Sequence, residues 1–325
     1  MTSKPRYIPP RRPSRSLSSF VIQSKSVISI TMATDLKSIL TPSLFQSLAE
    51  SGIPFSKTEP LDFNEVGRHI FMGEPPTPDP AWPALKILSE IGLDNMPDMM
   101  EFLPPPTSPK FPIQCLGLQM LLDQGPRRLK GVDGRWTNSY FDPVSHKLAR
   151  SWYSLPPEQR PDTWTRWKGT ATLDYWIVLR LCFGAPLVHN GTREGQEIGL
   201  RYTEETRATV EQETGQTDPN RKDRDSILSD VYGFQRLFSA GPPQGDDITA
   251  ASWGFWLTKL MDVHKPIIDR FGRYPYRNAV QGLISTEEEK KWLEETHHFG
   301  EAPPDIAKRV REDVEAGRWT PLGEA

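Results

Sequence analysis

The 325-residue chain lacks the features that stabilise small secreted proteins or anchor proteins in membranes. Its two cysteines, Cys115 and Cys182, are too few for a disulfide framework. Because both lie in apolar stretches, we expect two buried thiols in a reducing compartment. No apolar run approaches the roughly 18 residues that a membrane-spanning helix needs, so we expect a soluble protein without a membrane partner. The net charge of −3 gives no overall positive field, and we therefore expect no nucleic-acid partner.

The short motifs of common enzyme classes are also absent. There is no Gly-x-x-x-x-Gly-Lys-Ser/Thr phosphate loop, no Gly-x-Gly-x-x-Gly, no Gly-x-Ser-x-Gly and no His-Glu-x-x-His. His297 and His298 have no cysteine near them in the sequence, and no acid follows Asp246 and Asp247 at the spacing of metal ligands. We therefore predict neither a cofactor nor a metal site.

Residues 1–34 differ from the rest in composition, because they are basic and rich in serine and contain no acid before Asp35. The basic residues are Lys4, Arg6, Arg11, Arg12, Arg15 and Lys25. We predict a disordered basic leader, since little of this segment can be buried. A mitochondrial transit peptide is one alternative, and a start of translation at Met32 is another. The expected location is the cytoplasm, or the mitochondrion if the leader is a transit peptide.

Proline divides the next segment, residues 35–111, into short pieces. Thr41 and Pro42 are the N-cap and first residue of a predicted helix that ends at Gly52. Residues 53–112 contain thirteen prolines, and we expect connectors around one short helix at 84–91. This segment is predicted to be a proline-rich extension with short helices.

The predicted core domain spans residues 112–299 and is helical. Apolar residues recur at helical spacing and no alternating strand pattern is found, so we predict an all-α fold. A capping box at residues 285–288 indicates one more helix, and residues 300–325 should form a final helix and tail. The main core helices are predicted at residues 113–124, 142–153, 171–186, 192–213 and 247–271.

His264 is the first candidate for chemistry, because the apolar stripe of the helix at 247–271 turns its imidazole inward. A buried neutral imidazole can act as an acid or a base. A core histidine that bonds to a neighbouring carbonyl is the favoured alternative. His189, at the end of the helix at 171–186, is a second candidate, although a histidine there more often caps the last carbonyls.

Three arginines follow His264 around a helix break made by Gly272 and Pro275. Such a cluster suits a carboxylate or phosphate ligand, because arginine grips both with paired hydrogen bonds. Internal ion pairs with Asp269, Asp123 or another acid are the alternative. For the three arginines together, we rate internal pairing and ligand binding about equally. The candidate ligand-binding residues here are Arg270, Arg273, Arg277 and Asn278.

A second polar cluster lies at residues 123–128, where Gly125 and Pro126 end a helix. Asp123 is left in the last turn, where the helix dipole disfavours a carboxylate, so it needs a cation such as Arg127. We predict that Asp123 orients a histidine or an arginine, and that Gln124 and Arg127 contribute to ligand binding. A structural ion pair that fixes the turn is the alternative.

These clusters resemble an uncharacterised family catalogued as domain of unknown function 924. Residues 121–127, Leu-Leu-Asp-Gln-Gly-Pro-Arg, are similar to its Leu-Leu-Asp-Gln-Phe-Pro-Arg-Asn block, and residues 185–189, Ala-Pro-Leu-Val-His, to its Pro-Leu-Met-His-Ser-Glu block. The most specific block is residues 264–278, His-Lys-Pro-Ile-Ile-Asp-Arg-Phe-Gly-Arg-Tyr-Pro-Tyr-Arg-Asn. The resemblance implies a tetratricopeptide-like stack of antiparallel helices with a concave groove. It implies no reaction.

The chain departs from the family pattern at several positions. Gly125 stands in place of an aromatic residue, Arg128 of an asparagine, and Tyr276 of a second histidine, while Asn190-Gly191 replaces Ser-Glu. Insertions near residues 155–170 and 214–245 indicate a specialised, fungal-type branch.

Two functions follow as hypotheses. In the first, a groove lined by arginine and histidine binds an anionic small molecule or a protein segment without chemistry. In the second, the protein is a cofactor-independent enzyme, for example of fungal secondary metabolism, in which His264 or His189 is the acid or base. The second requires both histidines, Asp123 and the arginines to converge on one site.

Overall fold

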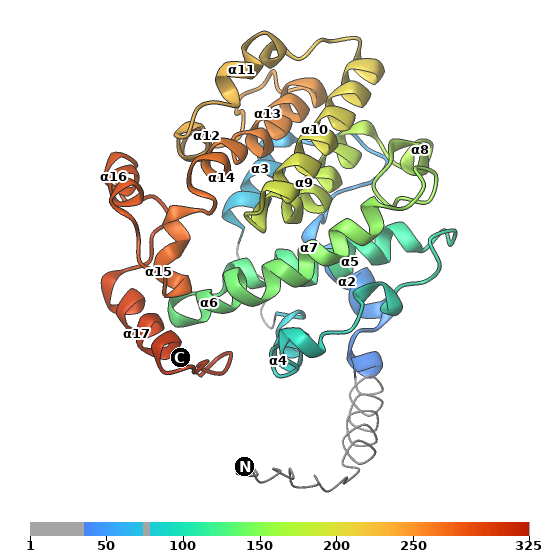
Figure 1. Ribbon diagram of the computed structural model, residues 1–325. Coiled ribbons are helices and arrows are strands. Elements are labelled where there is room, and N and C mark those ends of the chain that lie inside the picture. Colours follow the sequence, from blue (N-terminus) through green and yellow to red (C-terminus); the bar gives the residue numbers. More distant parts are fainter. Residues whose placement is uncertain (1–35, 74–78, 325) are drawn as a thin grey trace, which may run out of the picture. The chain divides into compact units, whose positions relative to one another are not determined.

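The structure is a computed structural model that describes residues 36–73 and 79–324 (Figure 1). The predicted leader, residues 1–34, lies outside the described residues. The chain divides into two compact units, residues 1–39 and 40–325; of the first, only residues 36–39 are described, and they are helical. The described residues form helices and no strand, apart from one isolated bridge between Lys168 and Ala171. The all-α prediction is confirmed.

Among the described residues from 40 on, three α-helices precede the core. They are α2 (Pro42–Gly52), α3 (Phe63–Met72) and α4 (Trp82–Ser89), followed by the 3-10 turns η1 (Leu93–Asn95) and η2 (Met99–Phe102). The Thr41 hydroxyl accepts from the backbone N–H of Leu44 at 3.2 Å, so the predicted cap is confirmed. The expectation of a single short helix in residues 53–112 was wrong, because α3 also forms there. Its N-cap, Asp62, accepts from the first-turn N–H groups.

The core is built around two helices that are apolar on all sides, α5 (Phe111–Asp123) and α9 (Leu173–His189). Such helices must be covered all round, and their neighbours do this: α5 packs on α2, α7 and α9, while α9 also packs on α10 and α13 (Figure 1). The neighbours are α7 (Asp142–Tyr153), α10 (Arg193–Thr214) and α13 (Ala250–Asp262). No described helix has the length and apolar character of a membrane span.

Close approach of α2 and α5 depends on Gly117. A Cβ atom at this position would lie 1.8 Å from the backbone oxygen of Phe45, which is far inside van der Waals contact. Only glycine allows the two helices to meet at this distance.

The connections between core helices contain shorter elements. They are η3 (Pro126–Arg128), η4 (Gly131–Asp133), α6 (Gly134–Trp136), the π-helix η5 (Thr137–Phe141), α8 (Trp164–Trp167), η6 (Pro219–Asp223), α11 (Arg224–Ile227) and α12 (Gly233–Ala240).

The buried thiols are confirmed, since Cys115 and Cys182 are both free and buried.

The single helix expected over residues 247–271 was wrong. The chain forms α13 and then α14 (Lys265–Phe271), with a break at Val263 and His264. Pro266 causes it, because proline has no N–H to donate and its ring clashes with the carbonyl four residues earlier. By contrast, α9 continues through Pro186 to His189, three residues beyond the predicted end.

The helix break that the sequence predicts at Gly272 and Pro275 is confirmed. Gly272 ends α14 with a φ of 72°, and Pro275 opens the turn η7 (Pro275–Arg277). Three helices follow: α15 (Asn278–Gln281), α16 (Glu287–Glu295) and α17 (Pro304–Glu315). The capping box that begins α16 is shifted by one residue from the prediction, because it is formed by Thr286 and Glu289.

Candidate functional site

The centre of the candidate site is the buried carboxylate of Asp123, the last residue of α5. It is 1% exposed, and its two oxygens lie 3.0 and 3.1 Å from Nδ1 of His189. Nη2 of Arg127 donates to Oδ1 at 3.3 Å, and Nε2 of Gln124 donates to Oδ2 at 2.5 Å. A carboxylate at a helix C-terminus is disfavoured by the helix dipole. The donors from three side chains offset that cost.

A second buried carboxylate, Asp142, links two arginines. Arg127 donates to Oδ1, and Nη1 of Arg277 donates to Oδ2 at 3.0 Å. Asp142 is 2% exposed and is the first residue of α7. The result is a charge-balanced chain of Asp123, Arg127, Asp142 and Arg277, which together with His189 we call the His189 network.

The π-helix η5 precedes Asp142 directly. In a π-helix each backbone hydrogen bond spans five residues instead of four, and this change in winding alters the direction in which the next side chain points. Its first residue, Thr137, donates from its hydroxyl to the backbone oxygen of Pro126 at 2.6 Å. This bond ties the helix that carries Asp142 to the turn that carries Arg127.

Arg277 and its neighbours also fix the last turn of α9. Arg277 donates to the backbone oxygen of His189, and its guanidinium lies 4.5 Å from the ring centroid of Tyr274. The hydroxyl of Tyr274 donates to the backbone oxygen of Val188 at 2.5 Å, and Nε2 of Gln196 donates to the same oxygen at 2.9 Å. The backbone that carries His189 is therefore held from two sides.

His189 is a neutral, oriented imidazole. Desolvation and the positive charge of Arg127 lower the pKa of His189 below its ordinary value, although Asp123 acts in the opposite direction. Burial alone would raise the pKa of Asp123, but His189 and Arg127 bring it below the usual range, so this carboxylate stays ionised. Since Asp123 can only accept, Nδ1 of His189 carries the proton. The imidazole is 21% exposed, and no hydrogen bond from the described part of the chain engages its Nε2.

His264 lies next to this network but is a different kind of residue. Its ring centroid is 6.3 Å from that of His189 and 4.1 Å from that of Phe234. Nδ1 donates to the backbone oxygen of Leu260 at 2.9 Å, and the residue is 4% exposed. Burial, with the nearby His189, lowers the pKa of His264 to about 3. This geometry is that of the core histidine bonded to a neighbouring carbonyl; a catalytic role for His264 stays a prediction.

The structure does not bring the other nominated residues to His189. Arg273 pairs with Glu289 through two hydrogen bonds of 2.6 and 2.7 Å, and Arg270 pairs with Glu288. Asn278 donates to the Ser285 hydroxyl at 3.0 Å, while its buried Oδ1 finds no partner among the described residues. These three side chains contact α16 or the turn before it, so the ligand-binding roles assigned to them remain untested predictions.

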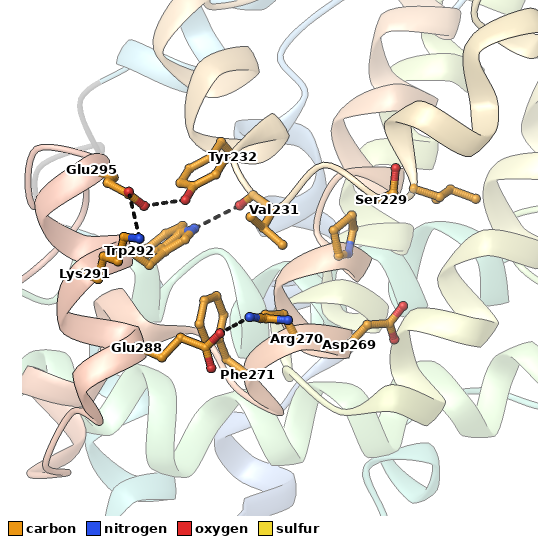
Figure 2. A pocket seen from close by; sticks show the side chains of 12 residues that line it. Ser229, Val231, Tyr232, Asp269, Arg270, Phe271, Glu288, Lys291, Trp292 and Glu295 are labelled. Atoms are coloured by element: carbon orange, nitrogen blue, oxygen red, sulfur yellow. Dashed lines mark hydrogen bonds and ion pairs between the residues drawn. The ribbon is translucent and has the colours of Figure 1, made fainter.

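Arg270 instead lines a cavity of about 520 Å³ between the segment after α11, α14 and α16 (Figure 2). Phe271 and Trp292 contribute apolar surface. The charges around it are already paired, as Figure 2 shows for Arg270 with Glu288 and for Glu295 with Tyr232 and Lys291. No arginine is left unpaired in this cavity to hold an anion.

Three residues of the site were missed from the sequence: Asp142, Tyr274 and Gln196. Arg127 and Arg277 indicate from the sequence that a carboxylate lies near them. They do not indicate which of the chain's acidic residues it is. For Asp142 itself, the sequence indicates only that a helix begins there.

Comparison with known proteins places the chain in a family. The family model described as "Bacterial protein of unknown function (DUF924)" matches residues 106–297, which is more than half of the chain and contains the whole His189 network. The chain belongs to the DUF924 family. No curated protein and no solved structure matches this DUF924 protein. The tetratricopeptide-like stacking and the fungal-type branch therefore stay predictions.

Proposed function

We propose that this DUF924 protein is a cofactor-independent enzyme in which His189 transfers a proton to or from a small substrate. The observation that carries the proposal is the asymmetry of the His189 ring. Nδ1 is held by Asp123 at 3.0 and 3.1 Å, whereas Nε2 has no hydrogen bond in the described structure and the side chain is 21% exposed. An imidazole held in this way presents a basic nitrogen in one direction.

The surrounding charges suit that role. A lowered pKa keeps His189 unprotonated near neutral pH, so Nε2 can accept a proton. When it does, the imidazolium lies directly against the ionised Asp123, which stabilises the new positive charge. Asp123 itself keeps no proton, because His189 and Arg127 hold its pKa low.

Arg127 supports Asp123 rather than contacting a substrate. Its Nη2 is occupied by Asp123 and Asp142, and its Nε, which has no partner in the described residues, is buried and out of reach of a ligand. The proposed chemistry is therefore proton transfer by His189 alone.

The alternative function is binding of an anionic small molecule or a protein segment without chemistry. It relied on free arginines, but Arg127, Arg270, Arg273 and Arg277 all pair with carboxylates. The internal ion-pair interpretation of the arginines is thus the one that the geometry favours. Arg270 and Arg273 do not join His189, so the enzyme is proposed without the arginine cluster that the sequence analysis required, and it rests on His189 and Asp123.

The test is turnover by the purified full-length chain. Wild type and the His189→Gln and Asp123→Asn variants are incubated with a metabolite extract, and consumption is followed by untargeted mass spectrometry. We expect at least one metabolite to be converted by wild type and its conversion to fall by about 10²-fold or more in His189→Gln. Arg236→Gln is the matched control, because it removes an arginine paired with Asp230 outside the His189 network and should leave turnover unchanged.

Two outcomes would contradict the proposal. One is conversion at equal rates by wild type and His189→Gln. The other is that wild type binds a metabolite from the same extract but converts none. That result would favour binding without chemistry.

A further inference from the structure

A second cavity, of about 310 Å³, lies along α13 and shares no lining residue with the His189 network. It is open to solvent and is lined by the segment after α10, by Leu237 of α12 and by one face of α13. Ser252, Phe255, Trp256 and Lys259 follow the i, i+3, i+4, i+7 spacing that places side chains along one side of a helix. Its volume is at the lower end of those that hold small molecules.

The lining of this cavity contains one cation and no acid. The cation is Lys259, which is half-buried and has no hydrogen bond or ion pair in the described part of the chain. The other polar lining residues are neutral: Gln216, Thr217, Asn220 and Ser252. Because Lys259 has no carboxylate partner in the described residues, its positive charge remains available to a ligand that enters the cavity.

The carboxylates that flank the cavity cannot supply that charge, because arginines already hold them. Asp218 accepts from Nε of Arg207 at 2.6 Å and from the Asn220 amide at 2.8 Å. Glu211 accepts from Arg221 in two hydrogen bonds of 2.7 Å. Neither acid lines the cavity, so the charge of Lys259 faces only neutral groups.

The apolar walls define the rest of the ligand. Phe255 and Trp256 are 4% and 9% exposed and belong to the core, and Leu237 and Pro219 add further apolar lining. Aromatic walls of this kind bind a flat or aliphatic body. One ammonium group balances one negative charge, which favours a monovalent carboxylate over a divalent phosphate.

We propose that this cavity binds a small organic carboxylate, with its negative charge at Lys259 and its apolar body against Phe255 and Trp256. The site goes beyond the proposed chemistry of His189 and does not depend on it. Binding there should be unchanged in His189→Gln, so the two proposals fail independently.

The experiment is isothermal titration calorimetry of the full-length protein with phenylacetate, hydrocinnamate and indoleacetate. Phenylacetamide serves as the uncharged counterpart of the first. We expect saturable binding of at least one acid to wild type, and at least tenfold weaker binding of that acid to Lys259→Met, which corresponds to about 1.4 kcal/mol. Phenylacetamide should bind at least tenfold more weakly than phenylacetate. Lys259→Arg should retain part of the affinity because it keeps the charge.

Lys222→Met is the matched control, since Lys222 is an exposed lysine of η6 that has no hydrogen bond or ion pair among the described residues and does not line the cavity. It should bind the acids as wild type does. The proposal is overturned if none of the three acids binds wild type below roughly 10 mM, if Lys259→Met binds equally well, or if Lys222→Met loses the same affinity.

Discussion

Replacing His264 with glutamine should make the protein less sensitive to mild acid. Burial lowers the pKa of His264 from 6.5 to about 3 in the folded protein, while an unfolded chain returns it to its ordinary value. Between these two values the unfolded state binds one proton more than the folded state. Stability that His264 contributes is therefore complete above pH 6.5 and is lost as the pH falls toward 3.

The size of the effect follows from the number of protons. One proton of difference changes the free energy of unfolding by about 1.4 kcal/mol per pH unit. Lowering the pH from 7 to 5 crosses about one and a half units of the window, so His264 should account for a loss of about 2 kcal/mol. The pKa values of His146 and His189 are also lowered, but these residues remain in the variant. His264→Gln should therefore remove only its own share.

The assay is urea unfolding of wild type and variant at pH 7 and pH 5, with the difference between the two pH values as the readout. Leu257→Ala is the control, because it removes a core side chain of α13 that is 1% exposed and has no titratable group. It should cost about 2–5 kcal/mol at both pH values and leave the difference unchanged. If His264→Gln loses as much stability on acidification as wild type, the neutral buried imidazole is refuted.

Two further changes test the packing and the charge network. Asp142→Asn should lower the free energy of unfolding by about 3 kcal/mol, because its two arginines are 23% and 11% exposed and would lose the carboxylate between them, which leaves Arg277 without an ion-pair partner among the described residues. A loss below about 1 kcal/mol in urea unfolding would show that the network is not a structural unit. Gly117→Ala should cost about 3 kcal/mol because its Cβ meets the Phe45 backbone, whereas Gly134→Ala, whose Cβ has no neighbour nearer than 3.4 Å, should cost less than about 1 kcal/mol in the same assay.

Much of the helical fold was accessible from the sequence because its signals are local. Thr41 is the N-cap of α2, as predicted. The capping box at the start of α16 lies one residue from its expected place. Helix ends set by proline were less certain. Pro266 breaks the helix at His264, whereas Pro186 lies inside α9, where the imidazole of His146 contacts the backbone oxygen of Pro186 at 3.2 Å. Tertiary contacts of this kind leave no local trace.

The candidate site was accessible only in part for the same reason. Asp123 and His189 were both nominated, but their direct contact joins residues that are 66 positions apart. The three arginines after His264 are close in sequence but do not share one site. Arg270 and Arg273 pair with the neighbouring acids Glu288 and Glu289 of α16, whereas Arg277, after the turns at Gly272 and Pro275, pairs with Asp142. Sequence spacing predicts a shared site only while the backbone between the residues is regular.

The state of the His189 ring is the most direct test of the account. Imidazole nitrogen chemical shifts are measured by heteronuclear NMR near neutral pH, with the His189 signals assigned by their absence in His189→Gln. The account expects a neutral ring with the proton on Nδ1 and an unprotonated Nε2, and a titration midpoint below 6.5. A ring protonated on both nitrogens at neutral pH, or a proton on Nε2 in the neutral ring, would contradict it.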